Sequence, residues 1–170
     1  MIAHRPYRDL ADLQAMHAVL SAGAAADTRA FYVHPGDLSW WLFYTTDEAP
    51  LCDRIWIWED EGEVIGWTLF SVDEGFVDLF VKPDWLEHEA YAEMHARSVA
   101  DMERRVRAAG GKRVAVMWID EADRARQALL LAQGFARAAG DRFVCMKQSL
   151  VGPLGQEPWP DGCTLREVFS

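Results

Sequence analysis

Cysteine is scarce in this sequence, and its spacing indicates no metal centre. The chain has three cysteines, none of them in a Cys-x-x-Cys pair: Cys52, Cys145 and Cys163. Such pairs are the usual sign of a structural zinc site or a redox dithiol, so we expect neither and interpret the thiols as reduced side chains in or near the core. The five histidines show no metal-ligand spacing either. We therefore predict no bound metal.

Basic residues and long apolar runs are also few. Lysine and arginine number 17 against 27 aspartate and glutamate residues, which gives a formal net charge of −10. Without a basic tract the chain would repel a phosphate backbone, so no nucleic-acid partner is expected. The longest apolar run, around 40–44, is far below the roughly 20 residues of a membrane helix, and the N-terminus has no signal-peptide core. We predict a cytoplasmic protein that does not bind membranes.

What the sequence does contain is the pattern of an ordinary globular domain. Hydrophobic residues make up 51 % and charged residues 26 % of the 170 positions, which is enough to bury one core. Alternating apolar residues predict strands, and apolar steps of three and four predict helices. The strands are predicted over 2–8, 54–59, 64–72, 76–81, 114–119 and 143–148, and the helices over 9–23, 38–44, 85–109 and 123–133.

Turn and cap residues refine this pattern. Two acidic turns that contain glycine, 60–62 and 73–75, join three successive strands and predict an antiparallel meander. Because these strands are apolar on both faces, we expect helices to cover both sides of the sheet. Asp9 and Asp37 are the predicted N-caps of the first two helices, and Gly23 is the predicted C-cap of the first.

The composition changes after residue 150. Three of the seven prolines and three glycines fall between 152 and 162. We therefore predict one domain over 1–150, followed over 151–170 by a linker rich in proline and glycine and by a C-terminal strand.

The order of the predicted elements resembles the GNAT acyl-CoA N-acyltransferase superfamily over 2–150. Two pieces carry the resemblance: Leu-Phe-Val-Lys-Pro-Asp at 79–84, which ends the fourth strand, and the helix at 128–135, which ends in Gly-Phe. The resemblance implies a mixed α/β (α+β) fold with a central, mostly antiparallel, twisted sheet flanked by helices on both faces. It also implies transfer of an acetyl group from acetyl-CoA to a primary amine of a small molecule or peptide.

The resemblance further implies where acetyl-CoA would lie. In this family the pantetheine arm enters between the splayed fourth and fifth strands, and a glycine-rich loop at the start of the long helix holds the diphosphate through backbone N–H groups. The positions of this chain that correspond to the cofactor site lie on the strand, in the loop and on the following helix. They are Leu79, Phe80, Val81, Leu86, Glu87, His88, Glu89, Asp123 and Arg126.

The loop itself departs from the family pattern. No glycine occurs between 75 and 110, Leu86 stands where the family has arginine or glutamine, and Glu89 and Tyr91 stand at the two small-residue positions. An Asp-x-x-Glu capping box at 84–87 is predicted to satisfy the N–H groups that a phosphate needs. Its carboxylates would also repel the diphosphate.

The catalytic groups are few. By resemblance Asp78 on the fourth strand is the candidate general base, with exposure to solvent or pairing with an arginine as the alternatives, and Leu130 replaces the family's proton-donating tyrosine. The acceptor is expected at four aromatic residues: Trp40, Trp41, Tyr44 and Trp67. The helix over 38–44 could equally be core or a partner surface, and His88 could be a ligand contact or a solvated helix end.

Two hypotheses follow for the function. The first is a GNAT-type N-acetyltransferase that uses acetyl-CoA, and the second is a catalytically inactive GNAT-fold module that binds a ligand or a partner domain. The segment over 160–168 resembles the first strand of another GNAT domain. A second GNAT-like module, or a homodimer formed by strand addition, is therefore an expected partner.

Overall fold

The computed structural model describes residues 1–26, 30–44 and 49–138. The chain divides into two units, Met1–Ala136 and Arg137–Ser170, and all the described helices and strands belong to the first. The strand predicted over 143–148 and the segment 151–170 lie outside the described residues. No helix in the described part of the chain is long and apolar enough to cross a membrane.

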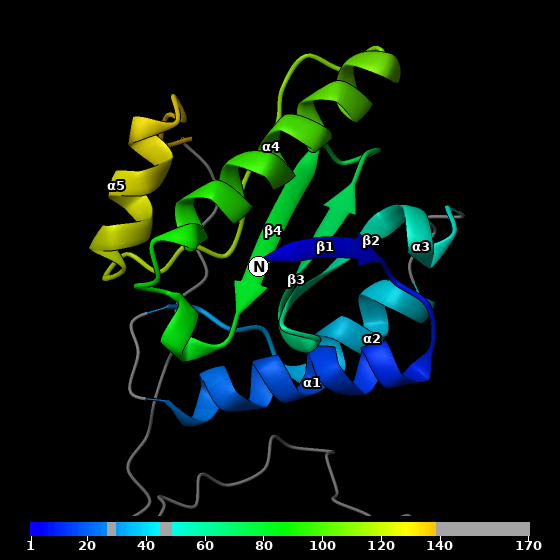
Figure 1. Cartoon of the computed structure of the whole chain (residues 1–170). Coiled ribbons are helices and arrows are strands. Elements are labelled where there is room, and N and C mark those ends of the chain that lie inside the picture. The colour runs from blue at the N-terminus through cyan, green and yellow to red at the C-terminus, as the bar shows by residue number, and fades with distance from the viewer. Residues whose placement is uncertain (27–29, 45–48, 139–170) are drawn as a thin grey trace, which may run out of the picture. The chain divides into compact units, whose positions relative to one another are not determined.

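Four antiparallel strands form the sheet, in the order β1-β2-β3-β4 (Figure 1). They are β1 (Ala3–Pro6), β2 (Ile55–Asp60), β3 (Glu63–Ser71) and β4 (Phe76–Val81). The predicted meander is confirmed, and Gly62 and Gly75 adopt the positive φ values, 84° and 73°, that its turns require. Gly66 allows β3 and β4 to approach closely, since a Cβ there would lie 2.6 Å from the Phe80 carbonyl oxygen.

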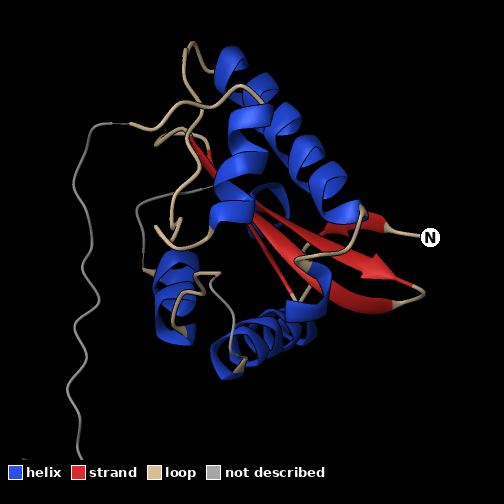
Figure 2. Ribbon diagram, turned by 90° about the vertical axis from the view of Figure 1, so that its left-hand side faces the viewer, coloured by secondary structure: helices blue, strands red, loops and turns tan. Residues whose placement is uncertain are grey.

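Helices cover both faces of this sheet, as predicted (Figure 2). The helical elements are α1 (Leu10–Ala25), α2 (Pro35–Phe43), α3 (Leu51–Arg54), the 3₁₀ turn η1 (Pro83–Trp85), α4 (Ala90–Ala108) and α5 (Arg124–Ala132). On one face, α1 and α2 bury Met16 and Leu38 against Trp67 and other sheet residues. On the other face, Met94 and Met102 of α4 are buried against the sheet. The periodicity of each helix thus buries one apolar stripe.

Buried polar side chains join α4 to its neighbours. Trp58 Nε1 donates to Thr68 Oγ1 at 2.8 Å, and Thr68 Oγ1 lies 2.9 Å from Ser98 Oγ, so a hydrogen-bond chain runs from the sheet to α4. His95 Nδ1 lies 2.7 Å from Oε1 of Gln133, the residue that follows α5. Burial lowers the pKa of His95 to about 4, so the ring is neutral at pH 7.

Three predicted helix ends are wrong. Gly23 lies within α1 rather than capping it, since the helix continues to Ala25; the glycine instead makes room for the Tyr32 ring, which a Cβ would approach to 2.2 Å. His34, not Asp37, is the N-cap of α2, and Asp37 completes a capping box from the N3 position. The helix predicted from residue 85 begins at Ala90 instead.

The predicted capping box at 84–87 is also absent. The N-cap of α4 is Glu89, which makes no side-chain cap hydrogen bond. Pro83 opens the 3₁₀ turn η1 in place of a helix start, and the Trp85 ring lies against His88 with 4.3 Å between the ring centroids. Packing of Trp85 and Leu86 on the core explains why the chain turns here before α4 begins.

Candidate functional site

The site lies where β4 and the segment 114–119 separate. Ala115 N–H donates to the Gly75 carbonyl at 2.8 Å, and Val77 N–H donates to the Ala115 carbonyl at 3.0 Å. Beyond this single parallel bridge, Met117 N–H donates to the side chain of Asp78 at 3.0 Å instead of to β4 backbone. The strand predicted over 114–119 is therefore wrong: among its residues only Ala115 forms a bridge, and a carboxylate replaces the strand partner at Met117.

The backbone of β4 leaves two residues facing this gap. Lys82 N–H donates to the Ile65 carbonyl at 2.8 Å, which fixes the alternation of hydrogen-bonded pairs between β3 and β4. By that alternation the N–H and C=O groups of Phe80 pair with β3, whereas those of Leu79 and Val81 point away from it. Of the three strand residues assigned to the cofactor by resemblance, only Leu79 and Val81 thus present main-chain groups to the gap.

Tyr32 occupies one of these groups. Its hydroxyl donates to the Val81 carbonyl at 2.8 Å, from a loop that is distant in sequence. Burial raises the pKa of Tyr32, so the phenol keeps its proton and remains a donor. No sequence pattern pointed to this residue, because the contact spans 49 positions.

Asp78 is a buried carboxylate at the centre of the gap. Its side chain is 1 % exposed, and Oδ1 lies 3.7 Å from Nη2 of Arg126, which is itself 5 % exposed. Among the described residues, Asp78 Oδ2 and the Nε and Nη2 atoms of Arg126 have no hydrogen-bond partner. Burial raises the pKa of Asp78 to about 7, although Arg126 and the Met117 N–H oppose this shift. A carboxyl group with such a pKa can accept or release a proton near neutrality.

Arg126 and Asp123 belong to the start of α5. Asp123 Oδ1 accepts the Arg126 N–H at 3.0 Å and so acts as the helix N-cap. The Asp123 carboxylate therefore caps the N-terminus of α5, while the Arg126 guanidinium lies 3.7 Å from the Asp78 carboxylate. Leu130, at the position of the family's proton-donating tyrosine, is buried and has no group that could donate a proton.

The segment between β4 and α4 bonds its own backbone amides. Leu86 N–H donates to the Pro83 carbonyl at 3.1 Å, and His88 N–H donates to the Trp85 carbonyl at 3.2 Å. The His88 side chain accepts the Ala90 N–H at 3.1 Å. A diphosphate at this position would have to displace these internal bonds.

The side chains of this segment carry negative charge. Asp84, Glu87 and Glu89 are all exposed around the first residues before α4, and no lysine or arginine occurs between 83 and 96. A like-charge contact at about 4 Å costs on the order of 1–4 kcal/mol near a protein surface. The residues present here therefore do not fit the diphosphate of acetyl-CoA.

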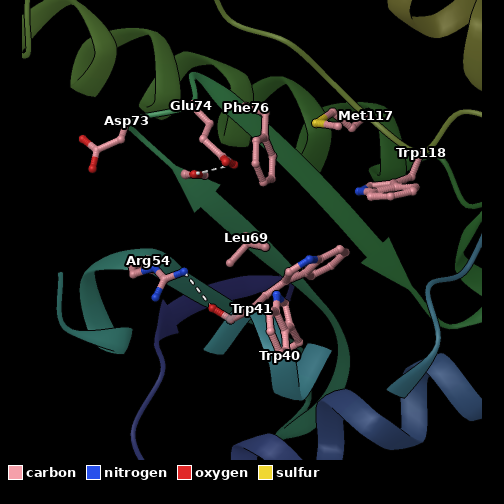
Figure 3. Close-up of a pocket in the computed structure, with 10 residues that line it drawn as sticks. Trp40, Trp41, Arg54, Leu69, Asp73, Glu74, Phe76, Met117 and Trp118 are labelled. Atoms are coloured by element: carbon pink, nitrogen blue, oxygen red, sulfur yellow. Dashed lines mark hydrogen bonds between the residues drawn. The ribbon is translucent and has the colours of Figure 1, made fainter. Parts of the chain in front are cut away.

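A pocket of about 280 Å³ opens on the face covered by α1 and α2 (Figure 3). It is lined by Trp40, Trp41, Arg54, Leu69, Ser71, Asp73, Glu74, Phe76, Met117 and Trp118. Leu69 is the cross-strand partner of Asp78, and Met117 donates its N–H to that carboxylate. Asp78 does not line the pocket, but two of the lining residues are its neighbours.

The four aromatic residues expected at the acceptor lie in three different places. Trp40 and Trp41 line the pocket, and Tyr44 is 70 % exposed and stacks on Trp40 with 5.5 Å between ring centroids. Trp67 is wholly buried in the core against Phe80, so it is not part of the pocket. No sequence pattern identified the remaining lining residues, since they come from three separate segments.

No metal site accompanies the pocket. Among residues 1–26, 30–44 and 49–138 there is no group of three or more His, Cys, Asp or Glu side chains that could hold a metal ion.

Comparison with known proteins identifies the fold. No family model matches the sequence, and no curated protein matches it. Many solved structures do match, among them an N-acetyltransferase from Staphylococcus aureus Mu50, at 16 % identity and a TM-score of 0.59, covering 82 % of this chain and 86 % of that one.

Two further matches have the same character. The ribosomal-protein-S18-alanine N-acetyltransferase from Escherichia coli is 13 % identical with a TM-score of 0.57, over 82 % of this chain and 80 % of that one. The diaminobutyrate acetyltransferase from Paenibacillus lautus, solved with its substrate and coenzyme A, is 13 % identical with a TM-score of 0.53, over 78 % and 74 %. The chain has the fold of the GNAT acetyltransferases.

Proposed function

We propose that this chain is a GNAT-fold binding module that does not turn over acetyl-CoA by itself. The observation that carries the proposal is the segment between β4 and α4. Five of its amides are bonded internally, and three carboxylates stand where the fold would otherwise hold a diphosphate. An anion site at a helix start needs free N–H groups and positive charge, and no lysine or arginine occurs between 83 and 96.

The gap between β4 and 114–119 supports the same proposal. Tyr32 already bonds the Val81 carbonyl, and the Arg126 guanidinium lies 3.7 Å from the carboxylate that bridges the gap. Internal side chains thus take positions that an acyl-thioester arm would need. The pocket beside Trp40 and Trp41 is then the binding site of the module.

A partner domain is a further part of this proposal. On α2 and just after it, Trp40, Phe43 and Tyr44 are 60 %, 54 % and 70 % exposed, at the helical spacing of three and four that gives one face. A second GNAT-like module or a second copy of this chain would bury these rings. If the partner is a second copy of this chain, light scattering of the full chain would show a dimer. If the partner is another GNAT-like module, it would show a monomer that dimerises weakly or not at all.

One observation favours the other hypothesis, an N-acetyltransferase acting on a primary amine. Asp78 has a pKa of about 7 and lies behind the pocket, so it could take the proton of an amine bound there. Leu79 and Val81 would then hold the donor's arm by their main-chain groups. Acetyl-CoA would supply the acyl group in that case.

Turnover distinguishes the two hypotheses. The full chain is incubated with acetyl-CoA and a panel of primary amines, and release of free thiol is followed with a chromogenic disulfide. The binding-module proposal predicts no thiol release above that of acetyl-CoA alone, while an active acetyltransferase of the same fold serves as the positive control. Amine-dependent release that is lost in Asp78→Asn would refute the proposal and support the acetyltransferase.

A further inference from the structure

We infer that the pocket of Figure 3 binds a small organic cation of the quaternary ammonium type, held by tryptophan faces and by the carboxylates of one turn. The inference rests on the proposed function, since it names the ligand class of the module's binding site. It concerns binding alone and requires no acyl donor.

The size of the pocket limits the ligand. Small-molecule sites commonly measure about 300–1,000 Å³, and this one, at about 280 Å³, is at the lower limit. A ligand with a few carbon atoms around one charged centre fills it. A nucleotide or a long peptide does not fit.

The aromatic wall comes from two segments. Trp40 and Trp41 belong to α2, and Trp118 belongs to the segment 114–119 that separates from β4. Trp41 and Trp118 lie with ring centroids 5.8 Å apart at 34°, and Phe31 stacks on Trp118 at 5.6 Å, so these rings form one packed aromatic cluster. Tryptophan faces are the strongest aromatic partners of a cation, because the ring quadrupole presents negative potential.

The backbone at Trp118 supports a role in binding. Its φ is 56°, in the left-handed region, which is rare for a bulky aromatic residue. A residue held in such a conformation costs about 1–3 kcal/mol, and this strain is found at ligand clamps more often than elsewhere. Here the unusual conformation brings the indole to the pocket.

The charges of the lining select a cation. Asp73 and Glu74 belong to the turn between β3 and β4; the Glu74 side chain lies beside Phe76, across the pocket from Trp40 and Trp41, whereas the Asp73 carboxylate points outward at its edge (Figure 3). Ser71 Oγ donates to Glu74 Oε2 at 3.3 Å and steadies that side chain. An anion would meet two carboxylates and the negative faces of the rings, and both contacts are unfavourable.

One positive group also lines the pocket. Arg54 is 5 % exposed, and its Nη2 donates to the Trp41 carbonyl at 3.1 Å, so this guanidinium is directed at the main chain of α2. The Arg54 contact fixes the position of Trp41. Two carboxylates against this one arginine leave the lining with net negative charge.

The apolar part of the lining favours a weakly hydrated cation. Leu69, Phe76 and Met117 contribute no carboxylate or hydroxyl, so a primary ammonium in their midst would lose hydrogen bonds to water without replacing them. A quaternary ammonium has no N–H group and loses none. This apolar part of the lining therefore favours alkylated amines.

The experiment compares two probes of the same shape. Choline and 3,3-dimethyl-1-butanol, its neutral isostere, are titrated separately into the full chain by calorimetry and by tryptophan fluorescence. We expect choline to bind at least tenfold more tightly than the neutral compound. Equal affinity for both, or binding of neither at about 50 mM, would overturn the inference.

Paired variants locate the binding. Glu74→Gln and Trp40→Leu should each weaken choline binding several-fold. Glu87→Gln and Phe43→Leu, which change the same kinds of exposed side chain outside the lining, should leave it unchanged. Urea midpoints equal to that of the parent chain establish that each variant is folded. Equal loss in variants and controls would place the cation elsewhere and overturn the inference, whatever the result with acetyl-CoA.

Discussion

The ionisation of Asp78 makes the stability of this protein depend on pH in an unusual direction. Its pKa is raised from 3.8 to about 7 in the folded chain, chiefly by burial. Between these two values the folded state binds more protons than the unfolded state does. The contribution of Asp78 to the free energy of unfolding is therefore highest below 3.8 and falls as the pH rises, until the pH has passed about 7. Most surface carboxylates act in the opposite sense.

Replacement of Asp78 by Asn removes this dependence and keeps an oxygen for the Met117 N–H. With pKa values of 3.8 and about 7, the contribution of Asp78 to the free energy of unfolding falls by about 2 kcal/mol between about pH 5.5 and pH 8. The difference between the parent chain and Asp78→Asn should fall by that amount. All other groups titrate in both proteins and cancel in the difference.

Urea unfolding followed by tryptophan fluorescence at several pH values measures this difference. Asp84→Asn, a change of the same kind at an exposed position, should give a profile parallel to that of the parent. Parallel profiles for Asp78→Asn as well would refute the assignment of a raised pKa to Asp78. A difference that grows with pH would refute it too, since it would mean a carboxylate stabilised by Arg126.

Three further predictions concern the fold. Thr68→Val leaves the buried Trp58 N–H without its acceptor and should cost about 1–3 kcal/mol in urea unfolding, whereas Thr68→Ser should cost less. Gly66→Ala places a methyl group 2.6 Å from the Phe80 carbonyl oxygen and should lower the free energy of unfolding by about 1–3 kcal/mol; an unchanged value would mean that β3 and β4 are farther apart. The His95 ring has a pKa of about 4 in the folded chain, so it should stay neutral in an NMR titration from pH 7 to about 5.5. Because the pKa in the unfolded chain is 6.5, the contribution of His95 to the free energy of unfolding is lost as the pH falls from 6.5 toward 4. A titration midpoint near 6.5 would contradict the burial of this ring.

Local sequence patterns were sufficient for much of the fold. β4 has the predicted bounds because glycine in the preceding turn and proline after the strand mark its ends. Helix α5 lies within its predicted range, with Asp123 as its cap. The helix α3 was not predicted, since its four residues are too few to show a period.

The site depends on contacts that no local pattern shows. The position of Asp78 on β4 follows from the resemblance, but its distance from Arg126 depends on how α5 packs. The Tyr32 contact with Val81 depends on a loop folding across the sheet edge. Trp118 has a left-handed conformation that only tertiary packing can impose on such a residue.

The segment before α4 shows what could and what could not be predicted from the sequence. The absence of glycine there predicts that its amides are not free for a phosphate, which stays a prediction, whereas the predicted capping box at 84–87 was wrong. Main-chain and His88 acceptors satisfy five of the amides instead. The sequence pattern alone does not distinguish N–H groups that donate to capping carboxylates from N–H groups that donate to main-chain carbonyls or to His88.

Equilibrium binding of acetyl-CoA tests the central claim most directly. Acetyl-CoA is titrated into the full chain in a calorimeter, with coenzyme A and acetyl phosphate as separate titrants. Because the amides of Trp85, Leu86, His88, Ala90 and Tyr91 are bonded internally and Glu87 and Glu89 repel a diphosphate, we predict no saturable heat up to about 1 mM ligand. Saturable binding with a micromolar Kd would contradict the account, because it would require a diphosphate site in this chain.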